Sequence, residues 1–319
     1  DAMNHYEQVL LLKPDYAEAH NNMGNALSAQ GKLVEAIGAF TKALALKSDY
    51  AEAFYSMGNA LSAQGKLAEA IEAYNKCLAI KPDYEEAYSN LGGALAEAGR
   101  FKEAMDNYEQ ILLLRPDSAE AYGNMGNALK GQGKLEEAIE AYTKAVALKP
   151  DYAGAHNNIG IVFQEQGELE EAIEAYNKAL AIKPDYAEAY LNMGNALNAL
   201  GKLEEAIEAY TKALTIKPDY AGAYNNIGIV FQEQGELEEA IEAYNKALAI
   251  KPDSAEAYNN LGNALRVQGE HEEARGVYNK ALALKPEYTE AYYNMGITLQ
   301  EQGKLEEAIE SYTKALALK

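Results

Sequence analysis

Hydrophobic and polar residues recur along the chain with a period of 34 residues, as residues 187–220 show with the sequence AEAYLNMGNALNALGKLEEAIEAYTKALTIKPDY. Apolar side chains return at the spacing of one helix face before Gly201, and they do so again after it. Gly201 is placed to end the first helix in a left-handed conformation, and Pro218 follows the second helix, where no helix continues. Each repeat is therefore predicted to form two amphipathic helices, A and then B, and the fold is predicted to be all-α.

The repeats, numbered 1 to 9 below, start at Ala17, Ala51, Glu85, Ala119, Ala153, Ala187, Ala221, Ala255 and Thr289. Positions within a repeat are counted from 1 to 34 from its first residue. Residues 1–16 match only the last 16 positions, and residues 289–319 stop at position 31. The sequence thus predicts a partial repeat at 1–16 with helix B only, eight full repeats over 17–288, and a ninth repeat at 289–319 that lacks its last three residues. Because each repeat contacts only its neighbours, we expect a single elongated domain.

The residues that recur are, for the most part, an aromatic at position 4, Leu or Met at 7, Gly at 8, Ala at 20, Tyr at 24 and Pro at 32. A helix-turn-helix unit of this length and pattern resembles the tetratricopeptide (TPR) repeat, and the resemblance covers all 319 residues. It implies an α-solenoid that coils into a right-handed superhelix, with the polar side of helix A lining a concave wall. It also implies a protein–protein interaction module.

Two local contacts are expected from the residue types. A glycine occupies position 8 in every repeat, although a glycine inside a helix costs about 1 kcal/mol against alanine. We expect it to allow close approach of helix A to the alanine at position 20. At the joints, an aspartate such as Asp15 precedes a glutamate by three residues, here Glu18, which predicts a capping box in which the aspartate caps helix A.

Charge narrows the choice of partner. The chain has 28 Lys and Arg against 49 Asp and Glu, a net charge of −21, which argues against nucleic acids and anionic membranes. An acidic surface favours a basic protein or peptide partner, although such charge also serves solubility alone. The given residues contain neither a signal peptide nor an apolar run of about 18 residues, and a cytoplasmic location without membrane contact is expected. Because the chain begins inside a helix B, any targeting segment is expected to lie upstream of Asp1. The single cysteine, Cys77, is expected to be a small packed residue.

Asparagine dominates position 6 of helix A, where eight of nine repeats carry it and Ser56 is the exception. Asparagine is a poor residue inside a helix, costing up to about 0.7 kcal/mol against alanine. Its amide supplies donors and an acceptor, the set that pairs with the main chain of another protein. Either these amides form a ladder that grips an extended peptide, or they are solvated or bond between neighbouring helices. The eight candidate residues are Asn22, Asn90, Asn124, Asn158, Asn192, Asn226, Asn260 and Asn294.

The ladder, in its NLG or NMG context, is similar to the TPR superhelix of O-linked N-acetylglucosamine transferases. There the equivalent asparagines bind substrate peptides, so the resemblance implies the same role for the eight residues above. One alternative is that the chain is the non-catalytic, substrate-recruiting region of a larger O-glycosyltransferase. A second is a structural, self-assembling array with no ligand.

Position 9 lies one turn further along and gives the additional candidates Asn25, Asn59, Asn127, Asn195 and Asn263. The other repeats carry Gly93, Ile161, Ile229 and Ile297 there, and the isoleucines either offer apolar pockets or pack between helices. All but two of the 24 tyrosines fall at positions 4, 24 or 34. The exceptions, Tyr55 and Tyr293 at position 5, are candidate aromatic contacts for a ligand.

No catalytic or metal-binding constellation is found in the sequence. The four histidines lack metal-ligand spacing, and the Glu pairs of helix B are expected on a solvated face. We therefore expect a non-enzyme without cofactor. The last helix B carries Ile309, Tyr312 and Leu316 on the face where another helix would pack, which predicts either a longer natural protein or end-to-end self-association.

Overall fold

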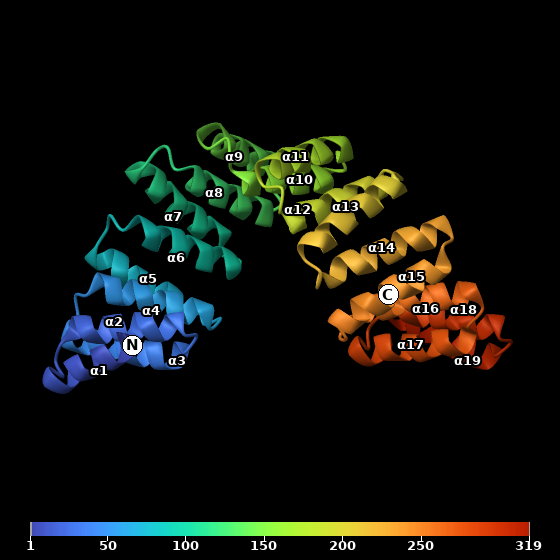
Figure 1. The fold of residues 1–319 in the computed structure, drawn as a ribbon, viewed down its shortest axis with the longest axis horizontal. Helices are drawn as coiled ribbons and strands as arrows, with labels where there is room; N and C mark the ends of the chain where they lie inside the picture. The colour runs from blue at the N-terminus through green and yellow to red at the C-terminus, as the bar shows by residue number, and fades with distance from the viewer. Residues whose placement is uncertain (1, 319) are drawn as a thin grey trace. The chain divides into compact units, whose positions relative to one another are not determined.

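The computed structural model describes residues 2–318, which are helical apart from short turns (Figure 1). These residues form nineteen helices and contain no strand, so the predicted all-α fold is confirmed. Contact density divides the chain into two compact units, Asp1–Val162 and Phe163–Lys319, with the boundary inside α10.

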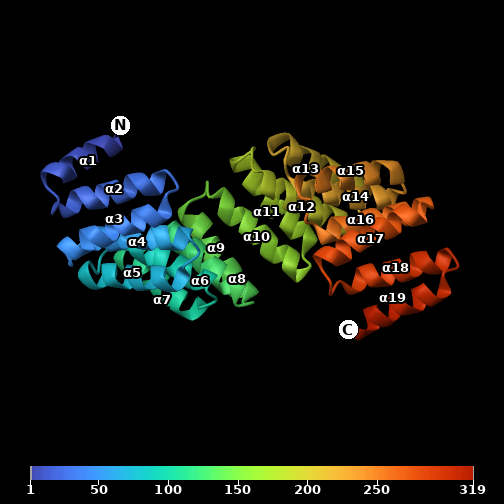
Figure 2. The same ribbon diagram turned by 90° about the horizontal axis from the view of Figure 1, so that it is seen from below.

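The helices up to this boundary are α1 (Ala2–Leu12), α2 (Ala17–Ala29), α3 (Leu33–Leu46), α4 (Ala51–Ala63), α5 (Leu67–Ile80), α6 (Glu85–Glu97), α7 (Phe101–Leu114), α8 (Ala119–Gly131), α9 (Leu135–Leu148) and α10 (Ala153–Gln166). The remaining helices are α11 (Leu169–Ile182), α12 (Ala187–Ala199), α13 (Leu203–Ile216), α14 (Ala221–Gln234), α15 (Leu237–Ile250), α16 (Ala255–Gln268), α17 (His271–Leu284), α18 (Thr289–Glu301) and α19 (Leu305–Ala317). Even-numbered helices are helix A of a repeat, and odd-numbered helices are helix B. Within each compact unit, helices that follow one another in the chain lie side by side (Figure 2).

The turn between helix A and helix B is made by a glycine in the left-handed conformation, as predicted. Nine glycines at position 15, from Gly31 to Gly303, have φ between 73° and 93°. In repeat 1, the N–H of Lys32 reaches back to the carbonyl of Leu27 at 3.0 Å across this turn. The bond satisfies a carbonyl that the end of the helix would otherwise leave unpaired.

The start of helix A differs from the prediction. The capping position is the last residue of the preceding repeat, such as Tyr16 before α2, and not the aspartate at position 33. The Asp–Glu pair is therefore one residue out of register for a capping box. A side chain caps the helix at Ser118 and Ser254, which accept hydrogen bonds from the N–H groups of Ala121 and Ala257 at 3.3 and 3.2 Å.

The glycine at position 8 faces the aromatic ring at position 24 of its own repeat, and not the alanine at position 20. A Cβ at Gly58 would lie 2.5 Å from Cε1 of Tyr74, and one at Gly24 would lie 2.5 Å from Cε1 of Phe40. The predicted close approach of helices A and B is thus made onto the flat face of a ring.

Both helices of a repeat contribute to the core, and helix B supplies most of its largest buried side chains. The alanines at position 20 are fully buried from Ala36 to Ala274, and so are most of the rings at position 24. Cys77 is buried with them as a free cysteine, and burial raises the pKa of its thiol to about 11. This agrees with its expected role as a small packed residue.

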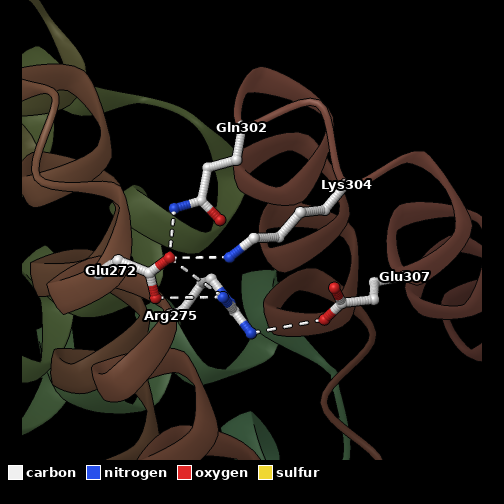
Figure 3. A network of polar contacts seen from close by, with 5 residues as sticks. All are labelled: Glu272, Arg275, Gln302, Lys304 and Glu307. Carbon is white, nitrogen blue, oxygen red and sulfur yellow. Dashed lines mark hydrogen bonds and ion pairs between the residues drawn. The ribbon is translucent and has the colours of Figure 1, made fainter.

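Charged side chains join consecutive repeats at the turn edge, as the network of Glu272, Arg275, Gln302, Lys304 and Glu307 shows (Figure 3). Lys304 Nζ and Gln302 Nε2 donate to Glu272 Oε1 at 2.8 and 3.0 Å. These hydrogen bonds hold the pKa of Glu272 below its usual value. The pairs are exposed, so each adds little stability, and they lie on another part of the repeat than position 6.

Replacing Gly58 with alanine tests the ring contact. The Cβ would overlap the buried ring of Tyr74, so we expect Gly58→Ala to destabilise the protein by about 1–3 kcal/mol. Gly38→Ala is the matched control, because its Cβ meets no atom within 4 Å; it should stabilise helix α3 by about 1 kcal/mol. Urea unfolding followed by circular dichroism measures both, and equal effects would contradict the ring contact.

Candidate peptide-binding face

The side chains at position 6, called the amide row below, all lie on helix A. Asn22 on α2 is exposed, and the other seven asparagines are half-buried. The row follows the order of the repeats because position 6 falls on the same turn of each helix A.

Most of the row is hydrogen-bonded to the preceding repeat. In three places the amide Nδ2 at position 6 donates to Oδ1 at position 9 of the repeat before it: Asn90 to Asn59 at 2.8 Å, Asn158 to Asn127 at 2.9 Å and Asn226 to Asn195 at 2.7 Å. In two further places the acceptor is the asparagine at position 5: Asn260 to Asn225 at 3.2 Å and Asn294 to Asn259 at 3.0 Å. Bonding between neighbouring helices, which the sequence left as an alternative, therefore occurs.

The tyrosine hydroxyl at position 24 supports these contacts. It donates to position 9 of its own repeat where that residue is asparagine: Tyr74 to Asn59 at 2.8 Å, Tyr142 to Asn127 at 2.7 Å, Tyr210 to Asn195 at 2.9 Å and Tyr278 to Asn263 at 2.8 Å. Where position 9 is isoleucine, it donates to glutamine at position 12 instead: Tyr176 to Gln164 at 2.9 Å, Tyr244 to Gln232 at 3.3 Å and Tyr312 to Gln300 at 3.0 Å. Burial raises the pKa of the hydroxyls of Tyr74, Tyr176, Tyr210, Tyr244 and Tyr278, that of Tyr278 to about 12, so these five stay protonated donors at neutral pH.

The asparagines at position 9 thus have mainly a supporting role. Asn59, for example, accepts from Tyr74 and from Asn90 at once. In repeat 1 the residue at position 24 is Phe40, which has no hydroxyl to donate to the exposed Asn25. The asparagines at position 5 and the glutamines at position 12 were not among the predicted site residues. The glutamines do have a signal in the sequence, because Gln stands at position 12 in every repeat that has Ile at position 9.

The isoleucines at position 9 are half-buried, and Ile229 packs against the core cluster around Tyr244 and Leu261. Of the two choices left by the sequence, packing between helices describes Ile229. Ile161 and Ile297 have the same partial burial.

The two tyrosines at position 5 lie in different surroundings. Tyr55 is half-buried: its ring centroid lies 4.9 Å from that of Tyr84, and its hydroxyl accepts from Asn90 Nδ2 at 3.1 Å. Tyr293 has 55% of its surface exposed and lines a hollow of about 560 Å³ with Tyr312 and Leu316. Tyr293 is therefore the more accessible of these two candidate contacts.

Ser56 is the one break in the row, and a side-chain oxygen of the preceding repeat lacks a hydrogen bond there. Asn21 at position 5 is only 5% exposed, and its Oδ1 accepts no hydrogen bond. In repeats 7 and 8 the corresponding oxygen is bonded by the next asparagine of the row. A serine side chain is too short to take that place.

Two family models match the chain. The model for the C-terminal domain of cilia and flagella-associated protein 70, a TPR domain, matches residues 115–319. The TPR repeat model matches residues 1–31, 24–65, 58–99 and 92–133. The chain belongs to the tetratricopeptide-repeat family. TPR scaffolds are suited to protein–protein interaction. Neither of the two matching models describes an enzyme, and the narrower likeness to O-linked N-acetylglucosamine transferases therefore stays a prediction.

Solved structures of TPR proteins are similar as well. YrrB, described as a TPR protein with an unusual peptide-binding site, is 27% identical over 58% of this chain and 95% of its own, with a TM-score of 0.48. MamA is 33% identical over 52% of this chain and 96% of its own, with a TM-score of 0.45. The anaphase-promoting-complex assembly Cut9–Hcn1 aligns with 99% of this TPR chain and 78% of its own at a TM-score of 0.61 and 15% identity, a likeness of fold. A search of curated proteins found no match.

Residues 2–318 contain no group of three or more His, Cys, Asp or Glu that could hold a metal ion. None of their helices combines the length and apolar character needed to cross a lipid bilayer.

The supporting role of position 9 can be measured. Asn195→Ala removes the acceptor of both Tyr210 and Asn226 and leaves a buried hydroxyl unpaired, so we expect a loss of about 1–2 kcal/mol despite the better helix propensity of alanine. Asn25→Ala is the matched control, because Phe40 donates nothing to it, and it should stabilise the protein by about 0.5 kcal/mol. Similar urea midpoints for the two variants would show that the hydroxyl contacts carry no stability.

Proposed function

We propose that this TPR protein is a non-catalytic scaffold that holds an extended segment of a partner along helix A, through hydrogen bonds between the amide row and the partner's main chain. The observation that carries the proposal is the set of contacts at 2.7–3.2 Å that orients five amides of the row.

The orienting bonds consume only part of each amide. An asparagine amide has two N–H donors and a carbonyl oxygen with two lone pairs. Asn158, for instance, donates one N–H to Asn127, which leaves the other N–H and the carbonyl for a ligand. An amide that is already held in place loses less side-chain entropy when it binds, which favours affinity.

A basic segment fits this scaffold best. The net charge of −21 attracts cations over distances of about 10 Å or less at physiological salt and speeds their association. We propose an intracellular partner of this kind and no nucleic acid or membrane ligand. Main-chain recognition predicts broad sequence tolerance, with selectivity added by individual side chains.

Backbone methylation of a bound peptide tests this proposal. A 12-residue peptide selected from a random phage library would be resynthesised with N-methyl groups at alternate residues, which removes main-chain donors and keeps every side chain. We expect binding, measured by fluorescence anisotropy, to weaken at least tenfold.

The protein side of the same experiment uses the triple variant Asn158→Ala, Asn192→Ala and Asn226→Ala, which should also weaken binding at least tenfold. The matched control replaces three exposed asparagines of helix B, Asn177, Asn245 and Asn279, and should change affinity less than twofold. Unchanged binding of the methylated peptide, or of the row variant, would overturn the proposed function.

A second proposal concerns self-association, which one observation favours. The last repeat exposes an apolar face: Leu305, Ile309 and Leu316 are 60%, 65% and 72% exposed, beside Tyr293. We propose that copies of the chain associate end to end through this face at high concentration.

Ile309→Glu places a charge on that face and should give a monomer at every concentration in a dilution series of size exclusion with mass detection. Val34→Glu on α3, at a side chain 76% exposed, is the control and should behave as the wild type does. A wild-type protein that is monomeric throughout the series would exclude end-to-end association.

A further inference from the structure

A single carboxamide oxygen joins two donors at the boundary between repeats 4 and 5. Oδ1 of Asn127, at position 9, accepts from the hydroxyl of Tyr142 at 2.7 Å and from Nδ2 of Asn158 in the next repeat at 2.9 Å. The residues at position 9 of repeats 2 and 6 accept the same pair of bonds. The tyrosine at position 24 and the next amide of the row therefore share one acceptor in these repeats.

Repeat 3 lacks this shared acceptor. Its position 9 is Gly93, and its position 12, which supplies the alternative acceptor for the tyrosine elsewhere, is Ala96. The two donors are still present as the hydroxyl of Tyr108 and Nδ2 of Asn124, and neither bonds to a residue among 2–318. Both keep some contact with solvent, so a ligand can reach them. Burial raises the pKa of Tyr108 to about 12, and its hydroxyl therefore stays a protonated donor at neutral pH.

A hollow of about 580 Å³, called the repeat-3 hollow below, lies at this place and is lined by both donors. A Cβ built at Gly93 would meet no atom within 4 Å, so the space of the side chain that other repeats carry is open. The ring of Tyr108 packs on Gly92 as the rings of the other repeats pack on position 8. Its hydroxyl is thus placed beside the space that the acceptor fills in those repeats.

Acceptors line the same hollow. Asn90 donates from Nδ2 to Asn59 at 2.8 Å and to Tyr55 at 3.1 Å, which leaves its carbonyl oxygen for a ligand. The carboxylate of Glu97 is exposed and lies in no ion pair with a described residue. A ligand that matches the hollow must therefore offer one acceptor to the two donors and at least one N–H to these oxygens.

We propose that the repeat-3 hollow is a specificity pocket for a carboxamide side chain, glutamine or asparagine, of the bound segment. The inference rests on the proposed function, because the amide row holds the segment that carries this side chain. The carboxamide oxygen accepts from Tyr108 and Asn124 in place of the missing asparagine at position 9. Its N–H groups donate to Glu97 or to the carbonyl oxygen of Asn90.

Other side chains match only part of the hollow. Arginine and lysine have no acceptor for the two donors. A carboxylate has no donor, and it would meet the like charge of Glu97. An apolar side chain would displace water from polar groups without replacing its hydrogen bonds. Tyr108 is only 3% exposed, so its hydroxyl lies deep in the hollow, where a side chain reaches it more readily than a main chain held by the amide row.

The test uses three fluorescein-labelled dodecapeptides of alternating Lys and Ala that differ only at one central residue: glutamine, its isostere glutamate, or norleucine. The lysines suit the acidic surface and are the same in all three peptides. Affinities are measured by anisotropy at 150 mM NaCl. We expect the wild-type protein to bind the glutamine peptide about fivefold or more tightly than either of the others, since only glutamine supplies both an acceptor and a donor.

Gly93→Asn fills the hollow with the side chain that other repeats carry at this position. Its oxygen would accept from Tyr108 and Asn124, so thermal stability should rise. The glutamine preference should fall below twofold, while the norleucine peptide binds as before. Gly276→Asn on α17 adds the same side chain at another open glycine; it is the control and should retain the preference.

Removing one donor is the second arm. Tyr108→Phe deletes only the hydroxyl, and the fold accepts phenylalanine at position 24, as Phe40 shows in repeat 1. The glutamine preference should fall about threefold because one of the two bonds to the carboxamide oxygen is lost. Tyr244→Phe, the same change in repeat 7, where the hydroxyl donates to Gln232, should alter the preference less than twofold.

The outcomes separate the pocket from the proposed function. Equal affinity of the three peptides for the wild-type protein would overturn the pocket and leave the main-chain proposal standing. A glutamate peptide that binds as tightly as the glutamine peptide, or a glutamine preference that persists in Gly93→Asn, would also overturn the pocket alone. Absence of binding by all three peptides would overturn the pocket together with the proposed function.

Discussion

The contact on which the rest of this structure depends is the packing of the aromatic ring at position 24 against the glycine at position 8. The ring fills the space that a Cβ would occupy, as at Gly58 and Tyr74, and so fixes how helix B lies on helix A. Its hydroxyl then emerges beside position 9 and holds the side chain there. One buried residue thus sets both the packing within a repeat and the orientation of the polar groups on helix A.

The polar face is built outward from that ring. The hydroxyl fixes an asparagine or glutamine of its own repeat, and an asparagine at position 9 or 5 accepts in turn from the amide row of the next repeat. The proposed binding role is compatible with this structural role, because one N–H orients the side chain and the remaining groups of the amide are not used by that bond. Where both acceptors are absent, in repeat 3, the face opens into a hollow with unpaired polar groups.

The period, the helix pairs and the left-handed glycines could be predicted from the sequence because they depend on local residue types. The capping residue was misplaced by one position, since Asp and Glu at the joint suit two registers equally well in the sequence. The predicted contact of the glycine at position 8 with the alanine at position 20 was also wrong, since Gly58 faces Tyr74 at position 24. The two residues lie on the same face of helix B, so the sequence pattern does not distinguish them. The acceptors of Asn90 and Asn260 are 31 and 35 residues away, and the choice between them depends on how adjacent helices are rotated. No spacing rule within one repeat contains that information.

A structure of the complex with a selected peptide, determined by crystallography, tests the central claim most directly. The account predicts that amides of at least three consecutive repeats lie within hydrogen-bond distance of N–H and C=O groups of the peptide main chain. A peptide bound elsewhere on the repeats, or amides that bond only to one another while the peptide is held by its side chains, would contradict it.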